Sequence, residues 1–336
     1  RIKCVNGTWS LITSGDSFAE QTLAEEKPEI VEDNSEHSII TNFIHSKSIS
    51  LKPKELIMSD LKWKYLIRSA MRGRNIMMCG HAGSGKTMAA KYLVKALERP
   101  DFYFNLGATQ DPRATLIGNT HFDKDRGTYF AESTFIKAIQ TPNAVILLDE
   151  LSRAHPEAWN ILMTVLDVNQ RYLRLDEKDG SPIINVAEGV CFIATANIGN
   201  EYTSTRVLDR ALLDRFITIE MDQLNAIEEE HLLTMLFPDA TKSLLKAIAE
   251  IAAFTRQECS SANAKISATM STRASVECAS LIYDGFTLAE AADVAIYPFF
   301  SDDGGAESER TFVKQLVQKY CVNPDAKADP LFSSAD

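Results

Sequence analysis

Residues 80–87 read Gly-His-Ala-Gly-Ser-Gly-Lys-Thr, which is the spacing of a phosphate-binding loop, G-x-x-x-x-G-K-[ST], between a predicted strand and a predicted helix. Its glycines let backbone N–H groups turn toward phosphate oxygens at the positive end of the following helix. Lys86 can reach the outer phosphates, and the Thr87 hydroxyl is a suitable ligand for Mg²⁺. The residues expected to bind the nucleotide are Gly80, Gly83, Ser84, Gly85, Lys86, Thr87 and Met88.

Two adjacent acids, Asp149 and Glu150, follow an apolar run at residues 145–148. Carboxylates at the end of a buried strand are costly unless their charges have a task. We expect Asp149, together with Thr87, to hold Mg²⁺, and Glu150 to orient or deprotonate the attacking water. The guanine-reading tetrad N-K-x-D is absent from the sequence, so the expected nucleotide is ATP.

Further polar residues follow the two phosphate motifs along the chain. Asn197 closes another apolar run, residues 191–197, and can hydrogen-bond the γ-phosphate or the attacking water. Arg210 and Arg215 come next, and Arg273 stands later at the start of a predicted helix. A lone arginine is usually a surface cation. On the residues alone, each of these arginines is therefore more often a surface cation than a group in nucleotide chemistry.

The elements that must position these residues alternate along the chain. Apolar runs predict strands at residues 75–79, 102–105, 144–148, 190–196 and 217–221. Helical periodicity predicts helices at 61–72, 86–97, 135–140 and 159–168, and after residue 222 only helices, at 226–237, 241–255, 271–283, 288–296 and 307–320. Such alternation indicates a parallel sheet covered on both faces. The expected fold class is therefore α/β: a P-loop αβα sandwich with a parallel sheet, followed by an all-helical lid domain.

The same pass along the chain predicts four parts. Residues 1–50 are expected to be an acidic leader, flexible or forming a small appended element. Residues 51–222 are the predicted nucleotide-binding domain, and 223–322 the predicted lid domain. Residues 323–336 are expected to be a frayed tail.

Composition narrows the class of protein. The 336 residues carry a formal net charge of −11, which argues against a protein that coats nucleic acid through a general basic field. No stretch approaches the ~20 apolar residues of a membrane span, and residues 1–10 lack the layout of a secretory signal. The six cysteines are widely spaced without a C-x-x-C pair, which is typical of a reduced compartment, so we expect a cytoplasmic protein.

From about residue 61 to 320 the sequence resembles the MoxR-type branch of the AAA+ ATPases, which includes the ATPase subunit of aerobic cobaltochelatase. The resemblance is carried by the loop at 80–87, Leu-Leu-Asp-Glu-Leu-Ser-Arg-Ala at 147–154, Ala-Thr-Ala-Asn at 194–197, Ala-Leu-Leu-Asp-Arg-Phe at 211–216 and Ser-Thr-Arg-Ala at 271–274. Members of this branch carry an extra hairpin, which residues 117–130 resemble. A second hairpin is expected at 171–185, turning at 178–181.

The resemblance implies a role for each remaining polar residue. Asn197 corresponds to sensor 1 and Arg273 to sensor 2. Arg215 corresponds to the arginine finger that reaches a neighbouring subunit's γ-phosphate, and Arg210 is the alternative finger. Asn105 resembles the polar switch that holds the catalytic glutamate away from water. The chain departs from the usual Ile-Asn-Arg after the acids, because Ser152 replaces the asparagine, which leaves the role of that position in doubt.

Three functions compete on this basis. The first is a ring-forming ATPase, by family habit a hexamer, that remodels a protein partner with a von Willebrand A-type domain. The second is a nucleic-acid motor, for which basic and aromatic residues near the two hairpins are the candidates: Lys124, Arg126, Tyr129, Phe130, Arg171, Tyr172 and Arg174. The third is a binding module that uses ATP only structurally. The presence of Glu150 together with Asn197 counts against this third function.

Overall fold

The computed structural model describes residues 2–5, 8–11, 35–125, 127–197 and 208–322. The chain divides into two compact units, residues 1–42 and 43–336. In the first, β1 (Ile2–Val5) pairs antiparallel with β2 (Thr8–Leu11), and α1 spans Glu36–Asn42. The acidic run at 20–32, Arg126 and the tail at 323–336 lie outside the described residues.

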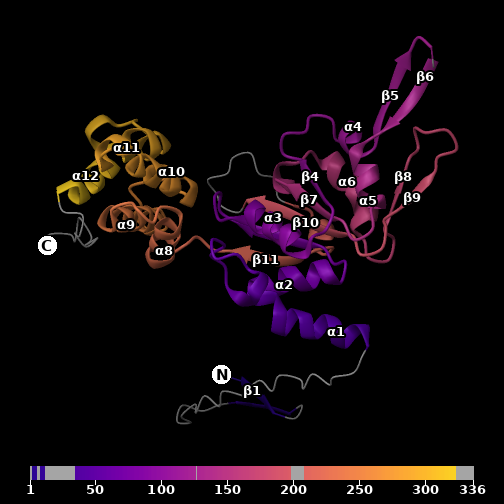
Figure 1. The fold of residues 1–336 in the computed structure, drawn as a ribbon, viewed down its shortest axis with the longest axis horizontal. Helices are drawn as coiled ribbons and strands as arrows, with labels where there is room; N and C mark the ends of the chain where they lie inside the picture. The colour runs from indigo at the N-terminus through magenta and orange to yellow at the C-terminus, as the bar shows by residue number, and fades with distance from the viewer. Residues whose placement is uncertain (1, 6–7, 12–34, 126, 198–207, 323–336) are drawn as a thin grey trace. The chain divides into compact units, whose positions relative to one another are not determined.

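A five-stranded parallel sheet forms the centre of the second unit, in the order β11-β3-β10-β7-β4 (Figure 1). The strands are β3 (Ile76–Gly80), β4 (Asp101–Asn105), β7 (Val145–Asp149), β10 (Cys191–Asn197) and β11 (Ile217–Met221). The apolar runs form the inner strands because both faces of a parallel sheet are covered. Every residue of β3 and β7 is buried. The predicted α/β fold class is confirmed.

Helices pack on this sheet at both faces. They are α2 (Asp60–Met71), α3 (Lys86–Leu97), α4 (Pro112–Leu116), α5 (Thr134–Gln140), α6 (Pro156–Leu166) and α7 (Arg210–Leu213), with a 3₁₀ turn at Leu151–Arg153. Alternate strand residues such as Met77 and Ile146 join one core with Phe135 of α5 and Leu162 of α6. The helix α3 contacts β3, β7 and β10 outside that core.

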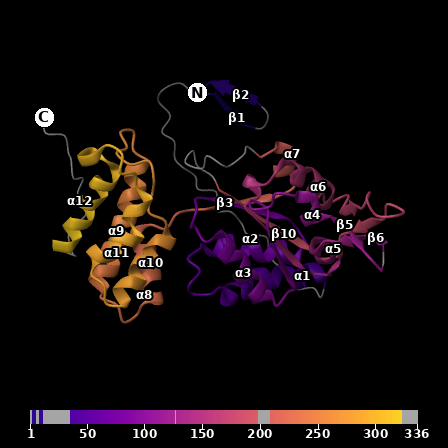
Figure 2. The same ribbon diagram turned by 90° about the horizontal axis from the view of Figure 1, so that it is seen from above.

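Only helices follow β11 within the described residues, as the sequence predicted. They are α8 (Ala226–Leu236), α9 (Lys242–Cys259), α10 (Thr272–Tyr283), α11 (Leu288–Ala295) and α12 (Glu309–Val322), and Figure 2 shows them gathered in one bundle. They enclose a core of their own, which includes Ile248, Cys278 and Tyr320. No described helix is long and apolar enough to cross a bilayer.

Both predicted hairpins are present. β5 (Gly118–Asp123) pairs with β6 (Gly127–Glu132), and β8 (Tyr172–Arg174) with β9 (Ile183–Asn185). Lys178 in the second hairpin makes a 2.6 Å ion pair with Glu132 in the first.

The second hairpin does not offer the cations that the nucleic-acid hypothesis requires. The Arg171 guanidinium donates to Gly73 O and lies over the ring of Phe192, with 5.5 Å between guanidinium carbon and ring centroid. Burial lowers the pKa of Arg171. Arg174 is paired with Asp176 at 2.7 Å. Arg171, one of the candidate residues of the nucleic-acid alternative, thus packs inward against the sheet.

The second unit begins before the boundary expected at residue 51. A π-helical turn (Phe43–Lys47) and a 3₁₀ turn (Ser48–Leu51) lead into α2. The fully buried Trp63 of α2 donates from its indole N–H to Ser48 O at 2.8 Å, and Ile44 is also buried. Neither turn has α-helical periodicity, so apolar spacing did not reveal that residues 43–51 belong to the core.

Two truncations test this boundary. A chain that starts at Ser35 should unfold at the temperature of the full chain. A chain that starts at Lys52 loses Ile44 and the acceptor of the Trp63 indole, which should lower the free energy of unfolding by about 2–4 kcal/mol. Thermal unfolding measures both, and equal stability of the two truncated chains would contradict the packing described here.

Candidate nucleotide-binding site

The loop between β3 and α3 has the conformation of a phosphate cradle. Gly83 and Gly85 adopt φ values of 77° and 82°, the left-handed region that glycine enters without strain. The Lys86 ammonium group donates to Gly80 O at 2.9 Å and to His81 O at 2.7 Å, and it lies 3.4 Å from Ser84 Oγ. Burial lowers the pKa of Lys86 to about 8, although nearby Asp149 opposes this shift. Met88 in the first turn of α3 is exposed.

Asp149 ends the inner strand β7 and is almost fully buried. Its carboxylate accepts hydrogen bonds from three hydroxyl groups: Thr195 Oγ1 at 2.5 Å, Tyr103 Oη at 2.9 Å, and Thr87 Oγ1 at 3.2 and 3.3 Å from the two oxygens. A buried carboxylate needs such donors to replace the water that it loses. The two residues expected to hold a metal ion, Thr87 and Asp149, are therefore in contact.

Glu150 follows in a left-handed conformation, with φ of 56°. Its backbone N–H donates to Thr195 Oγ1 at 2.9 Å, and its carboxylate pairs with Arg153 at 3.3 Å. A non-glycine residue in this region is uncommon and is found at functional sites. The turn directs the glutamate out of the buried strand, and its side chain is 32% exposed.

Asn197 and Asn105 end the strands β10 and β4 at the same edge of the sheet. Asn197 is opposite Gly80 in register, and Asn105 is opposite Asp149. The backbone N–H of Asn197 donates to the buried Ser152 Oγ at 3.3 Å. Ser152, which replaces the asparagine usual in the MoxR-type branch, therefore makes a structural contact. Asn105 Oδ1 accepts from Ala108 N at 3.1 Å, and the ion pair of Glu150 is made by Arg153.

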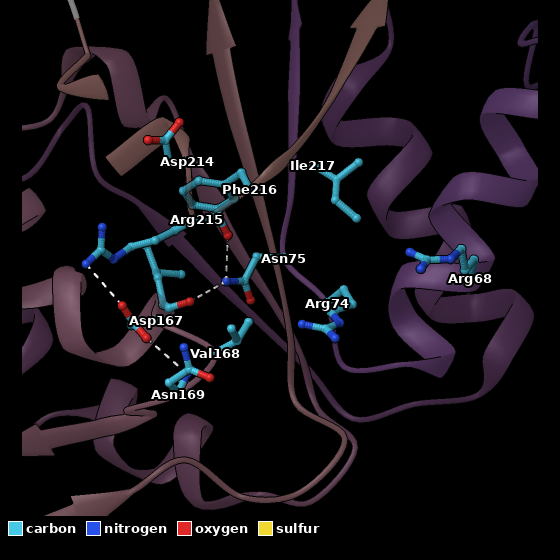
Figure 3. A pocket seen from close by; sticks show the side chains of 11 residues that line it. Arg68, Arg74, Asn75, Asp167, Val168, Asn169, Asp214, Arg215, Phe216 and Ile217 are labelled. Carbon is cyan, nitrogen blue, oxygen red and sulfur yellow. Dashed lines mark hydrogen bonds and ion pairs between the residues drawn. The ribbon is translucent and has the colours of Figure 1, made fainter. Parts of the chain in front are cut away.

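Arg215, the first candidate finger arginine, lies toward the opposite edge of the sheet. Arg215 precedes β11, whose last residue, Met221, is opposite Gly80. At about 3.3 Å per residue, six residues separate Arg215 from the phosphate loop by about 20 Å. Figure 3 shows its guanidinium directed at Asp167, a 3.2 Å ion pair, and it also donates to Met163 O at 3.0 Å and to Ala211 O.

Arg210 differs from Arg215 in its surroundings. It is the first residue of α7 and is exposed. Within the described part of the chain, its guanidinium has no hydrogen bond or ion pair. Arg215 is thus held by its own subunit, whereas Arg210 projects from the surface.

The lid residue Arg273 is brought to the phosphate loop by the start of α10. The hydroxyl of Ser271 caps this helix by accepting from Ala274 N at 3.3 Å. A Cβ added to Gly83 would lie 3.1 Å from Ser271 Cβ and 3.7 Å from Arg273 N. The exposed Arg273 therefore starts from a backbone that touches the loop expected to cradle phosphate.

The sequence interpretation missed Tyr103, Thr195 and Gly107. Thr195 bridges the two acids, and Tyr103 contacts Asp149 from the neighbouring strand. Burial and the hydrogen bond to Asp149 raise the pKa of Tyr103 to about 12. The available signal for Tyr103 was its position on the strand. It lies two residues before the strand end, and therefore on the same face as Asn105, whose register partner is Asp149.

No group of three or more His, Cys, Asp or Glu side chains in the described residues is arranged to hold a metal ion. Mg²⁺ in nucleotide sites usually keeps several waters and takes one or two protein ligands in addition to phosphate oxygens. Thr87 and Asp149 fit this requirement, because both present oxygens at the mouth of the loop.

Comparisons with known proteins agree with this geometry. The family model for the AAA domain (dynein-related subfamily) matches residues 75–216, and the model for the CbbQ/NirQ/NorQ C-terminal region matches residues 237–319. "Putative chaperone BssE" of Thauera aromatica is 35% identical over 158 residues, 46% of this chain and 53% of that protein. An uncharacterized protein of Staphylococcus saprophyticus, SSP1341, is 30% identical over 155 residues, 45% of this chain and 57% of that one.

The chain thus matches about half the length of these curated relatives. Among solved structures, the closed state of Hsp104 with ATPγS and FITC casein aligns with a TM-score of 0.43 and 18% identity, over 62% of this chain and 40% of that chain.

Two substitutions separate phosphate binding from water activation. Lys86→Ala should lose nucleotide binding, because the outer phosphates lose their cation. Glu150→Gln should keep nucleotide binding and retain ATP unhydrolysed, because only the activation of water is lost. Nucleotide affinity and turnover of the two variants measure this difference. Turnover near that of the wild type in Glu150→Gln would disprove the role of the glutamate.

Proposed function

Because the chain belongs to the AAA+ ATPases of the MoxR type, we propose that it hydrolyses Mg-ATP in a ring of identical subunits and uses the reaction to remodel a protein partner. One observation carries the proposal. Lys86, Asp149 and Glu150 meet at one edge of the sheet, while Arg215, just before β11, lies toward the other edge.

The residues at the phosphate edge divide the chemistry among them. Lys86 and the N–H groups of the loop would bind the phosphates of ATP, and Thr87 and Asp149 would hold Mg²⁺. The ion, when bound, neutralises charge on the transferred phosphoryl group. Glu150 would orient the attacking water, and Asn197 would hydrogen-bond the water or the γ-phosphate.

The trans arginine is better assigned to Arg210 than to Arg215. Arg215 is held by Asp167 and by two backbone carbonyl groups, so releasing it would leave a partly buried carboxylate unpaired. Arg210 is exposed and has no competing partner in the described chain. We propose that Arg210 reaches the neighbour's γ-phosphate and that Arg215 fixes α7 to α6.

A protein client is supported by the hairpin β5–β6. Phe122 is 76% exposed on it, and Tyr129 is 40% exposed. One relative carries the word chaperone in its name.

The nucleic-acid alternative loses support because Arg171 packs inward and Arg174 is paired. The resemblance further suggests a hexamer and a client with a von Willebrand A-type domain. Five cysteines of the second unit are free thiols, which supports a reduced compartment such as the cytoplasm: Cys79, Cys191, Cys259, Cys278 and Cys321.

If the active site is shared, turnover per subunit should rise steeply with protein concentration. Arg210→Ala should lower turnover by about 10³-fold, the scale of a lost arginine finger, while nucleotide affinity of the isolated subunit stays unchanged. Mixing Arg210→Ala subunits with Lys86→Ala subunits should restore part of the activity, because some interfaces join an intact loop to an intact finger.

Arg215→Ala provides the comparison. It should lower the melting temperature, because α7 loses its contact with α6, and its turnover at a temperature where it is folded should exceed that of Arg210→Ala. A loss of turnover as large as that of Arg210→Ala, at an unchanged melting temperature, would make Arg215 the finger. Turnover that does not depend on concentration, together with mixtures that never regain activity, would leave a self-contained monomeric ATPase instead.

A further inference from the structure

The edge strand β4 and the turn that follows it contact both acids of the site. Tyr103 lies on β4 opposite Leu147 in register, two residues before the pair Asn105 and Asp149. The backbone N–H of Leu106 donates to Asp149 O at 3.0 Å, so the ladder continues one residue beyond the strand. The turn at residues 106–109 is thereby fixed beside the acids.

Tyr103 fixes the carboxylate of Asp149. Its hydroxyl donates to Oδ2 at 2.9 Å, while Thr195 donates to Oδ1 at 2.5 Å. With one strong donor on each oxygen, the plane of the carboxylate is set, and the remaining lone pairs face Thr87. The ring of Tyr103 is held in turn by the ammonium group of Lys91, 5.9 Å from its centroid.

Gly107 sets the space available to Glu150. A Cβ added to Gly107 would lie 2.4 Å from Glu150 Oε2 and 2.8 Å from Glu150 Cβ. The carboxylate end could move aside, but the Cβ of Glu150 is fixed by its backbone. Any side chain at position 107 therefore displaces Glu150 or the turn itself.

Asn105 stabilises this turn from within. Its Oδ1 accepts from Ala108 N at 3.1 Å, and its backbone O accepts from Thr109 Oγ1 at 3.0 Å. Asn105 thus acts on Glu150 through the position of Gly107.

We propose that Tyr103 and Gly107 are positioning residues for the two acids. The Tyr103 hydroxyl orients the carboxylate of Asp149 toward the metal ion, and Gly107 leaves the space that the Glu150 side chain occupies when it orients the attacking water. The proposal rests on the proposed Mg-ATP hydrolysis. It predicts two different defects, because each residue contacts a different acid.

Tyr103→Phe keeps the ring over which Lys91 lies and removes only the hydroxyl. The Mg²⁺ concentration that gives half-maximal nucleotide affinity should rise about 10-fold, the scale of losing a group that orients a metal ligand. Nucleotide affinity in EDTA, and kcat at saturating Mg²⁺, should match the wild type. Tyr65→Phe is the matched control, since Tyr65 is a comparably exposed tyrosine on α2. An unchanged Mg²⁺ requirement, or an equal loss of affinity in EDTA, overturns the assignment of Tyr103.

Gly107→Ala should leave nucleotide affinity and the Mg²⁺ requirement unchanged and lower kcat by about 10- to 100-fold, the cost of misplacing a catalytic group by about 1 Å. Gly180→Ala is the control for backbone strain away from the site: no atom lies within 4 Å of a Cβ added there, but its φ of 80° makes the substitution strained, so it should lower the melting temperature and leave kcat unchanged. Wild-type kcat in Gly107→Ala, or a parallel loss of nucleotide affinity, overturns the assignment of Gly107.

The two arms also separate this inference from the proposed function. The Tyr103 arm is read from nucleotide affinity with and without Mg²⁺, which does not require hydrolysis or folding of the Gly107 variant. A wild-type protein that binds Mg-ATP but never hydrolyses it would refute the ATPase proposal. The role of Tyr103 would still be decided, because it is measured by the Mg²⁺ dependence of nucleotide affinity. A wild-type protein that hydrolyses ATP, with both variants unchanged, would refute the inference alone.

Discussion

The buried carboxylate of Asp149 is the constraint on which the nucleotide edge depends. An ionised group with so little contact with water must be surrounded by donors. Its three hydroxyl donors come from three different elements: Thr87 from α3, Tyr103 from β4 and Thr195 from β10. Satisfying one buried charge therefore fixes the phosphate loop, the edge strand and the strand of Asn197 relative to β7.

The same network explains why the Glu150 side chain is partly exposed while that of Asp149 is buried. Thr195 donates to Asp149 and also accepts from the N–H of Glu150, so the backbone reverses direction between two residues that differ in exposure. The left-handed turn at Glu150 and the close approach of Gly107 then direct the second carboxylate outward. Asp149 is held by its donors and Glu150 meets solvent, which suits the roles that we propose for them, metal ligand and water-activating group.

Most of the fold could be predicted from the sequence because its signals are local. The phosphate loop has a fixed spacing, and apolar runs identified all five strands of the sheet to within about two residues. Contacts between strands are not local: whether Tyr103 meets Asp149 depends on the register of β4 against β7, which one sequence does not reveal. For the same reason the sequence could not show that Arg171, a candidate nucleic-acid contact, lies against Phe192, or that Arg215, the candidate finger, is paired with Asp167. The turns at residues 43–51 were missed because π- and 3₁₀-helical segments lack the period of an α-helix.

A parallel sheet also separates the two halves of the proposed chemistry. Its carboxyl edge gathers the loop, the acids and Asn197, and its amino edge carries Arg215. About 20 Å of strand lies between Arg215 and the phosphate loop, so no side-chain movement within one subunit can bring that arginine to its own phosphates. An arginine at one edge can serve a nucleotide at the other only between different copies, through a head-to-tail contact. Repeated head-to-tail contacts close into a ring when the rotation permits. The direction of the strands therefore supports the ring that we propose, in which a neighbouring subunit would supply the positive charge that the carboxyl edge of each sheet lacks.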